Sequence, residues 1–226
     1  DCLKAVHKLQ TGGRRASTSA LAAQLGVAEP SVTAMVKRLA RLGLLEHVPY
    51  RGVELTVAGE KIALEIIRHH RLLELYLVEA LGLSWEKVHA EADRLEHVLS
   101  DELEDRMDEA LGYPTVDPHG DPIPTKTGDV DEGPVETLAD VGPGEVVAIR
   151  RVPDGDPRLL EYLAGLNLVP GALVGVVERA PFDGPVTLRT GQGLHAINRE
   201  LAGSIQISRP APEPPSSSSR ASDDGC

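Results

Sequence analysis

Cysteine and long apolar runs are both scarce in this chain. Its two cysteines, Cys2 and Cys226, stand at the extremes of the sequence and offer no disulfide framework. No stretch of about 18 consecutive apolar residues occurs, which excludes a transmembrane helix. No signal peptide is visible, although the chain begins at Asp1 without a methionine. We therefore expect a cytoplasmic protein with no membrane partner.

An overall excess of positive charge is also absent, because the 226 residues carry a net charge of −12. The charge is unevenly distributed, however. Residues 1–71 hold 11 lysines and arginines against 6 aspartates and glutamates, so the rest of the chain is strongly acidic. A basic N-terminal third and an acidic remainder suggest separate functions for separate domains.

The first third of the chain has the pattern of a winged helix-turn-helix. A polar cap at Ser17 precedes a short helix that stops at Gly26, and Pro30 opens a second helix. Gly43 ends that helix. Two short alternating runs then flank Tyr50-Arg51-Gly52, which is typical of a β-hairpin wing with a basic tip.

The exposed face of the second helix is expected to bind double-stranded DNA. Small residues at its start let the backbone approach the major groove, and the cations that follow would neutralise phosphates. The expected DNA contacts are Thr18, Ser19, Pro30, Ser31, Thr33, Ala34, Lys37, Arg38, Arg41 and Arg51. The alternative is a helical domain that binds other proteins.

The middle of the chain carries metal-ligand types of side chain at helical spacing. Counting from His89, the residues at +4, +7 and +8 are Asp93, Glu96 and His97. His70 and Glu74 repeat the i, i+4 spacing on what reads as the preceding helix. Positions so spaced share one helix face, and charges gathered there repel and resist burial unless a cation joins them. This favours a divalent metal ion over the alternative of a solvated acidic face.

Apolar periodicity predicts two long helices in this region. One covers residues 62–81 and ends at Gly82, and the other follows a cap at Ser84 and continues to Leu111. Their apolar stripes suggest a homodimer interface, because dimeric readers of palindromic sites are the usual solution for a helix-turn-helix.

The C-terminal half reads as a small β domain. Short strands are predicted at 145–152, 172–179, 186–189 and 204–207, with a short helix beginning at Pro157. The expected organisation is a winged helix-turn-helix at 1–65, a helical dimerisation and metal-binding domain at 66–116, a linker at 117–134, a β domain at 135–209 and a disordered tail at 210–226.

Three strings in the sequence resemble the diphtheria toxin repressor family of metal-dependent repressors, which includes iron-dependent regulators and manganese transport regulators. The strings are residues 70–74, 88–101 and 117–124. The resemblance covers at least residues 1–208. It implies a mainly α chain with a winged helix-turn-helix, a helical dimerisation domain and a C-terminal SH3-like β-barrel, as in ferrous-iron transport accessory proteins. It also implies a metal-activated repressor of metal-uptake genes that binds a palindromic operator.

The same resemblance implies two metal sites. The primary site would use Asp1, Asp93, Glu96 and His97. The ancillary site would use His70, Glu74 and His89, completed by Asp154 and Asp156 from the C-terminal domain.

The residues at positions 1 and 93 bear on which metal binds. Iron-responsive members resemble one another in carrying Met at the position of Asp1 and Cys at that of Asp93. Oxygen donors suit Mn(II), so Mn(II) is the expected cofactor and Fe(II) the alternative. Lys4 stands where some manganese regulators carry a second glutamate, which argues against a binuclear site built on that residue.

Two further interpretations come from other functional classes. A metalloenzyme could use the same cluster, but the sequence shows no dedicated nucleophile or base motif. A metal-independent regulator could instead bind a protein partner through the acidic middle. His69 is expected to be structural or exposed, and His119 to be part of a turn with Gly120 and Pro122.

Overall fold

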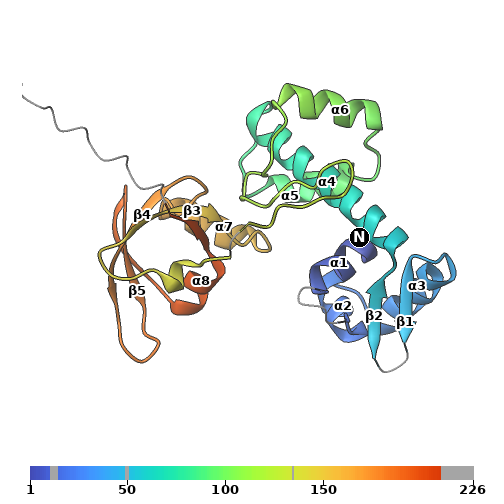
Figure 1. Cartoon of the computed structure of the whole chain (residues 1–226), viewed down its shortest axis with the longest axis horizontal. Coiled ribbons are helices and arrows are strands. Elements are labelled where there is room, and N and C mark those ends of the chain that lie inside the picture. The colour runs from blue at the N-terminus through green and yellow to red at the C-terminus, as the bar shows by residue number, and fades with distance from the viewer. Residues whose placement is uncertain (11–14, 49–50, 134, 210–226) are drawn as a thin grey trace, which may run out of the picture. The chain divides into compact units, whose positions relative to one another are not determined.

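The computed structural model describes residues 1–10, 15–48, 51–133 and 135–209 and forms two compact units (Figure 1). The first unit comprises Asp1–Pro134 with Asp154–Glu161, and the second comprises Val135–Pro153 with Tyr162–Cys226. The predicted wing-tip residue Tyr50 and the predicted tail at 210–226 lie outside the described residues. Within the described ranges, no helix is long and apolar enough to cross a membrane.

The first unit begins with the predicted winged helix-turn-helix. Its elements are α1 (Cys2–Leu9), α2 (Thr18–Leu25), α3 (Glu29–Arg41), β1 (Leu45–Val48) and β2 (Gly52–Leu55). The Ser17 hydroxyl accepts the amide of Ala20 at the start of α2, and Gly26 closes the helix in the left-handed region at φ 63°. The two strands pair antiparallel with Leu45 opposite Leu55. The core beneath them contains Leu3, Val6, Leu21, Val32, Val36 and Val53.

Helix α4 (Val57–Glu79) leads from the hairpin to the rest of the unit (Figure 1). The Thr56 hydroxyl accepts the Gly59 amide at its first turn. Gly59 lies directly against the chain before β1, where an added Cβ would meet the Leu44 carbonyl oxygen at 1.9 Å. This close approach fixes the start of α4 against the winged helix.

The predicted single helix over 85–111 is wrong. The structure has two shorter helices, α5 (Val88–Leu95) and α6 (Asp101–Ala110). The Ser100 hydroxyl accepts a hydrogen bond from the Leu103 amide, which starts a new helix. The acidic residues in the first turn of α6 interact favourably with the positive end of its helix dipole. Glu96 and His97 therefore stand just beyond α5 and not within a continuous helix.

The start of the segment predicted as a linker packs against α4. The Asp117 carboxylate accepts the backbone amides of His119 and Asp121 at 2.8 and 2.9 Å, which closes a tight loop. Arg71 of α4 forms an ion pair with Asp121 at 3.0 Å, and Ile123 is buried against α4. This loop is part of the helical core, because buried polar groups hold it in place.

The second unit is built on a five-stranded antiparallel sheet in the order β6-β5-β4-β3-β7. Its elements are the 3₁₀ helix η1 (Leu138–Asp140), β3 (Val146–Arg151), β4 (Leu173–Arg179), β5 (Val186–Thr190), β6 (Gly193–Ile197), α8 (Arg199–Ser204) and β7 (Gln206–Ser208). Helix α7 (Pro157–Gly165) begins in the first unit and ends in the second. The expected short strands and helix are present. Strand β6 and helix α8 were not predicted, because β6 is mostly exposed and lacks the alternation of a half-buried strand.

We predict that Gly59→Ala destabilises the chain. Alanine favours a helix interior by about 1 kcal/mol, but the clash with the Leu44 carbonyl forces a backbone shift that costs more. The expected net loss is about 1–2 kcal/mol in the free energy of unfolding, measured with urea. Val57→Ala in the same turn is the control, because Val57 is exposed. A Gly59→Ala chain as stable as wild type would contradict the close packing.

Candidate metal centre

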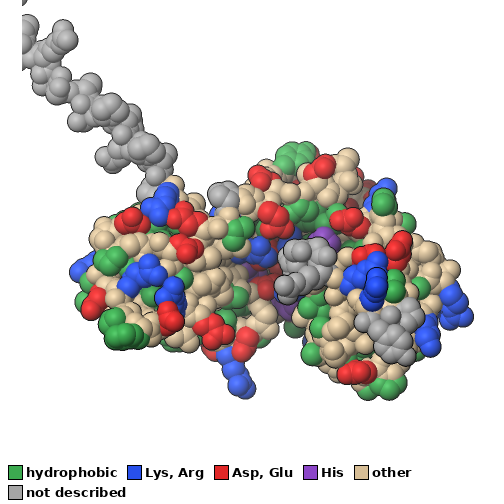
Figure 2. All heavy atoms as spheres, turned by 60° about the horizontal axis from the view of Figure 1, so that its bottom comes forward, with side chains coloured by type: hydrophobic (Ala, Val, Ile, Leu, Met, Phe, Trp, Pro, Cys, Tyr) green, Lys and Arg blue, Asp and Glu red, His purple; other side chains and the backbone are tan. Residues whose placement is uncertain are grey.

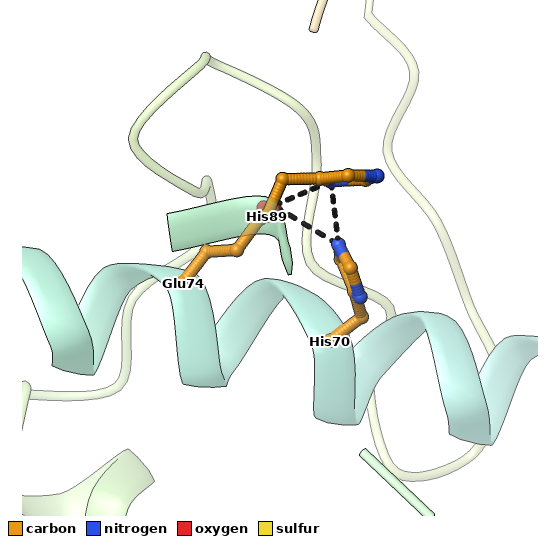
Figure 3. Close-up of side chains that lie close together, drawn as sticks. All are labelled: His70, Glu74 and His89. Atoms are coloured by element: carbon orange, nitrogen blue, oxygen red, sulfur yellow. Dashed lines mark hydrogen bonds and ion pairs between the residues drawn. The ribbon is translucent and has the colours of Figure 1, made fainter. Parts of the chain in front are cut away.

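Helices α4 and α5 bring His70, Glu74 and His89 together (Figure 3). We call these three residues the histidine cluster. Glu74 Oε1 lies 2.9 Å from His70 Nε2 and 2.9 Å from His89 Nδ1, and the two ring nitrogens are 3.0 Å apart. His70 and Glu74 are one helical turn apart on α4, so both face α5. The predicted ancillary set from these helices thus converges on one point.

Charge in the histidine cluster is balanced by protons in the metal-free chain. Burial would lower the pKa of His70, but hydrogen bonds to Glu74 and Glu96 outweigh it and raise this pKa to about 9. Burial would likewise raise the pKa of Glu74, yet the rings of His119, His70 and His89 beside its carboxylate hold this pKa well below its usual range. A divalent cation would take the place of such protons among these donor atoms.

A second group joins α1 to the end of α5, and we call it the α1 cluster. It consists of Asp1, Glu96 and His97. His97 Nε2 lies 2.8 Å from Asp1 Oδ1 and 3.4 Å from Glu96 Oε1. The Glu96 side chain is fully buried, whereas Asp1 and His97 are open to solvent. Three of the four predicted primary-site residues therefore meet.

The fourth predicted primary-site residue, Asp93, faces a different partner. Its Oδ1 lies 2.9 Å from Lys4 Nζ and 3.3 Å from His70 Nδ1. Lys4 also donates to both carboxylate oxygens of Glu96, at 3.1 and 2.7 Å. Burial would raise the pKa values of Asp93 and Glu96, but the Lys4 ammonium and His70 lower both. An ammonium thus occupies the space between these carboxylates.

His70 connects the two clusters through its two ring nitrogens. Its Nε2 faces Glu74 and His89, while its Nδ1 lies 2.6 Å from Glu96 Oε2. A proton on Nδ1 would be donated to Glu96 and would leave Nε2 free to coordinate a metal ion, the usual arrangement of a metal-binding histidine. The two clusters therefore share a hydrogen-bonded path.

The loop at 117–121 adds a third group, which the sequence reasoning did not find. Glu74, Asp117 and His119 offer ligand atoms within 4.8 Å of one another, and all three are buried. His119 stacks on Trp85, and its Nδ1 lies 3.7 Å from Glu74 Oε2 with no hydrogen-bond partner among the described residues. A buried nitrogen without a partner beside a carboxylate suits a metal ligand. The spacing of Asp117 and His119 was visible in sequence, but their approach to Glu74 was not.

His69, expected to be structural or exposed, is buried behind the centre. Its two ring nitrogens lie 3.2 Å from the Glu96 carbonyl oxygen and 3.2 Å from Glu104 Oε2. It thereby holds the backbone at Glu96 in position.

Asp154 and Asp156, predicted from the resemblance to complete the ancillary site, lie before α7. Asp154 Oδ1 is 3.5 Å from Lys8 Nζ. Burial would raise the pKa of Asp154, but the Lys8 ammonium lowers it. The Asp156 carboxylate accepts the Arg158 amide at 2.9 Å, so it caps α7. Among the described residues, neither aspartate belongs to a group of three close ligand atoms.

The predicted DNA contacts lie on the surface of the winged helix. Exposed among them are Ser19, Pro30, Ser31, Ala34, Lys37, Arg38, Arg41 and Arg51, and half-buried are Thr18 and Thr33. The Thr33 hydroxyl donates to the Glu29 carbonyl at 3.0 Å. Figure 2 shows lysine and arginine side chains standing out from this part of the surface. The exposure of these side chains on the winged helix suits contact with a phosphate backbone.

The donor set of the centre fits a divalent metal ion. The groups combine imidazole nitrogens with carboxylate oxygens, and the Lys4 ammonium already sits among three of those oxygens as a stand-in cation. No cysteine thiol belongs to any of these groups within the described residues. Such a set matches hard or intermediate cations better than soft ones.

Three family models match consecutive parts of the chain. They are "Iron dependent repressor, N-terminal DNA binding domain" at residues 1–53, "Iron dependent repressor, metal binding and dimerisation domain" at 56–125, and "FeoA domain" at 136–209. The last of these covers the five-stranded sheet. The first two cover the winged helix and the metal centre.

Whole-length relatives and solved structures agree with these matches. The iron-dependent repressor IdeR of Mycobacterium leprae is 31% identical, over 92% of this chain and 95% of that protein. IdeR of Mycobacterium tuberculosis is 33% identical over the same shares. A structure described as a manganese-dependent transcriptional repressor in complex with manganese is 34% identical with a TM-score of 0.82, over 92% of this chain and 97% of that one. ScaR with bound Zn2+ is 31% identical with a TM-score of 0.78, over 92% and 98%.

We predict that Glu74→Gln reduces the number of Mn(II) ions bound per chain by one. Glu74 belongs both to the histidine cluster and to the group with Asp117 and His119, so its carboxylate would bind a metal ion held by either group. Calorimetric titration of chelator-treated protein measures the stoichiometry. Glu79→Gln is the control, because Glu79 is exposed at the end of the same helix. Equal stoichiometry in Glu74→Gln and wild type would remove Glu74 from the ligands.

Proposed function

The chain belongs to the iron-dependent repressor family of metal-dependent transcriptional repressors, and from that premise we propose that Mn(II) is its activating metal. In this proposal the Mn(II)-bound homodimer binds a palindromic operator and represses genes for metal uptake. The metal sites would use Asp1, Asp93, Glu96 and His97, and His70, Glu74 and His89.

The donor set is the observation that carries the choice of metal. Every group of close ligand atoms in the described residues contains only carboxylates and imidazoles. Mn(II) accepts oxygen donors readily, while a sulfur ligand would favour Fe(II) or softer metals. The manganese-bound structural relative supports the same choice, whereas the IdeR relatives support Fe(II), which stays the second candidate.

Helix α1 is the element through which metal would control DNA binding. It packs on both α2 and α4, and Asp1 stands at its first turn. With a cation shared by Asp1, Glu96 and His97, α1 would be fixed to the end of α5, and the winged helix with it. This would set the position of α3 relative to the dimer partner. Metal can raise operator affinity only by the difference between its binding free energies for the DNA-binding and the non-binding conformations of the protein. This difference is typically about 1–3 kcal/mol, or roughly 5–150-fold in affinity.

A homodimer suits the surface of the dimerisation domain. Leu95, Val98 and Leu103 expose 40%, 76% and 51% of their surface on and between α5 and α6. Exposed apolar side chains gathered on one domain are typical of an interaction surface. A metalloenzyme has less support, because the relatives reported above are named as repressors.

The experiment that tests this function is operator binding by chelator-treated protein, titrated separately with Mn(II) and Fe(II) under anaerobic conditions. The probe is the palindromic promoter segment of the nearest metal-transporter gene. We expect binding only with metal, and at lower Mn(II) than Fe(II). Asp93→Ala should lose most of this activation and keep its helical circular dichroism, because Asp93 is half exposed and its removal leaves the core intact. Arg94→Ala is the matched control on the same helix. Binding that ignores metal would refute the proposal.

We also predict that Arg51→Ala weakens operator binding about equally for all sequences. Arg51 is exposed at the wing and would neutralise one phosphate, so the slope of log affinity against log salt should fall by about 1. Arg106→Ala, which removes an exposed arginine paired to Glu109 within α6, should keep the wild-type slope. An unaltered slope in Arg51→Ala would exclude the wing as a phosphate contact.

A further inference from the structure

We propose that Lys4 is a built-in cation of the metal centre. Its ammonium ties α1 to α5 in the metal-free chain and competes with divalent ions for the carboxylates of Asp93 and Glu96. Lys4 thereby limits both the affinity for metal ions and the number of metal ions bound at these carboxylates. The inference rests on the proposed metal-sensing function.

The surroundings of the ammonium resemble the coordination shell of a metal ion. Lys4 Nζ lies 2.9 Å from Asp93 Oδ1, 2.7 Å from Glu96 Oε2, 3.1 Å from Glu96 Oε1 and 3.3 Å from His70 Nδ1. These three residues, Asp93, Glu96 and His70, form one of the groups able to hold a metal ion. A surface lysine with a single ionic partner would gain little from such a contact, but here one cation serves two carboxylates. The position is therefore a cation site filled by the chain itself.

The attachment of Lys4 makes this contact a connection between two parts of the unit. Its neighbours Leu3, Ala5 and Val6 are buried in the core of the winged helix, so the backbone of α1 cannot shift freely. Glu96 is also fixed, since its side chain is buried and His69 contacts its carbonyl. The ion pair therefore restrains α1 relative to the end of α5 in the absence of metal.

Competition follows from the sharing of oxygen atoms. Both oxygens of Glu96 are engaged by Lys4, and a divalent ion at the α1 cluster must take at least one of them. Two cations a few ångströms apart repel strongly in a partly buried site. A divalent ion can bind beside Asp1 and His97 only if the ammonium withdraws toward Asp93. The Lys4 ammonium occupies the position that a second divalent ion among His70, Asp93 and Glu96 would need.

The test compares Lys4→Met with wild type in the full chain. Methionine keeps an unbranched side chain of similar length and removes the charge. We expect calorimetric titration of chelator-treated Lys4→Met with Mn(II) to show about tenfold or greater tightening, or one additional bound ion per chain. Hydrogen exchange supplies a readout independent of DNA binding. Without metal the α1 amides should exchange faster in Lys4→Met than in wild type, and added Mn(II) should restore their protection.

Two control variants separate the charge effect from other causes. Lys61→Met removes the same charge from an exposed position on α4 and should behave as wild type. Lys4→Arg keeps the cation and should retain wild-type Mn(II) affinity, which tests the idea even if Lys4→Met folds poorly. Mn(II) affinity and stoichiometry equal to wild type in Lys4→Met would overturn the inference. Failure of every variant and of wild type to bind Mn(II) or Fe(II) would instead overturn the proposed function.

Discussion

A single buried carboxylate, that of Glu96, governs the arrangement of the first unit. A carboxylate removed from water needs positive or hydrogen-bonding partners, because an unpaired buried charge is very costly. Lys4 of α1 and His70 of α4 supply them, and His69 holds the backbone of the same residue. Three helices therefore meet at one side chain. The break between α5 and α6 lies here too, because α5 ends at Leu95, immediately before Glu96.

The sharing of ligands makes the clusters of this centre interdependent. His70 contacts both the histidine cluster and Glu96, and Glu74 contacts both His89 and the buried loop that carries His119. A cation that draws Glu74 toward one group must alter its distance to the other. Under the proposed function, a metal ion at one position would therefore change the affinity of the next position for metal, which is the physical content of coupling between sites.

Local signals in the sequence were enough to predict most of the helices and part of the centre. Ser17 and Gly26 are caps whose chemistry acts within a few residues, and both stand where expected. The i, i+4 spacing also placed His70 and Glu74 on one face. The interruption of the second long helix at Ser100, the return of the loop at Asp117 and the insertion of Lys4 were not predicted. Each depends on contacts between segments far apart in the sequence, which periodicity does not encode.

Helix α1 divides its roles by face, with Leu3, Ala5 and Val6 in the core and Asp1 and Lys4 toward the metal centre. Substitutions at positions 1 and 4 thus alter the charge and donor atoms presented to a cation without repacking the interior. An exchange at the exposed Asp1 is consequently separable from fold stability, whereas an exchange at Lys4 also removes a partner of the buried Glu96 carboxylate. Under the proposed function, one or two exchanges at the N-terminal end of α1 would change the preferred cation while the DNA-binding surface on α3 stays the same.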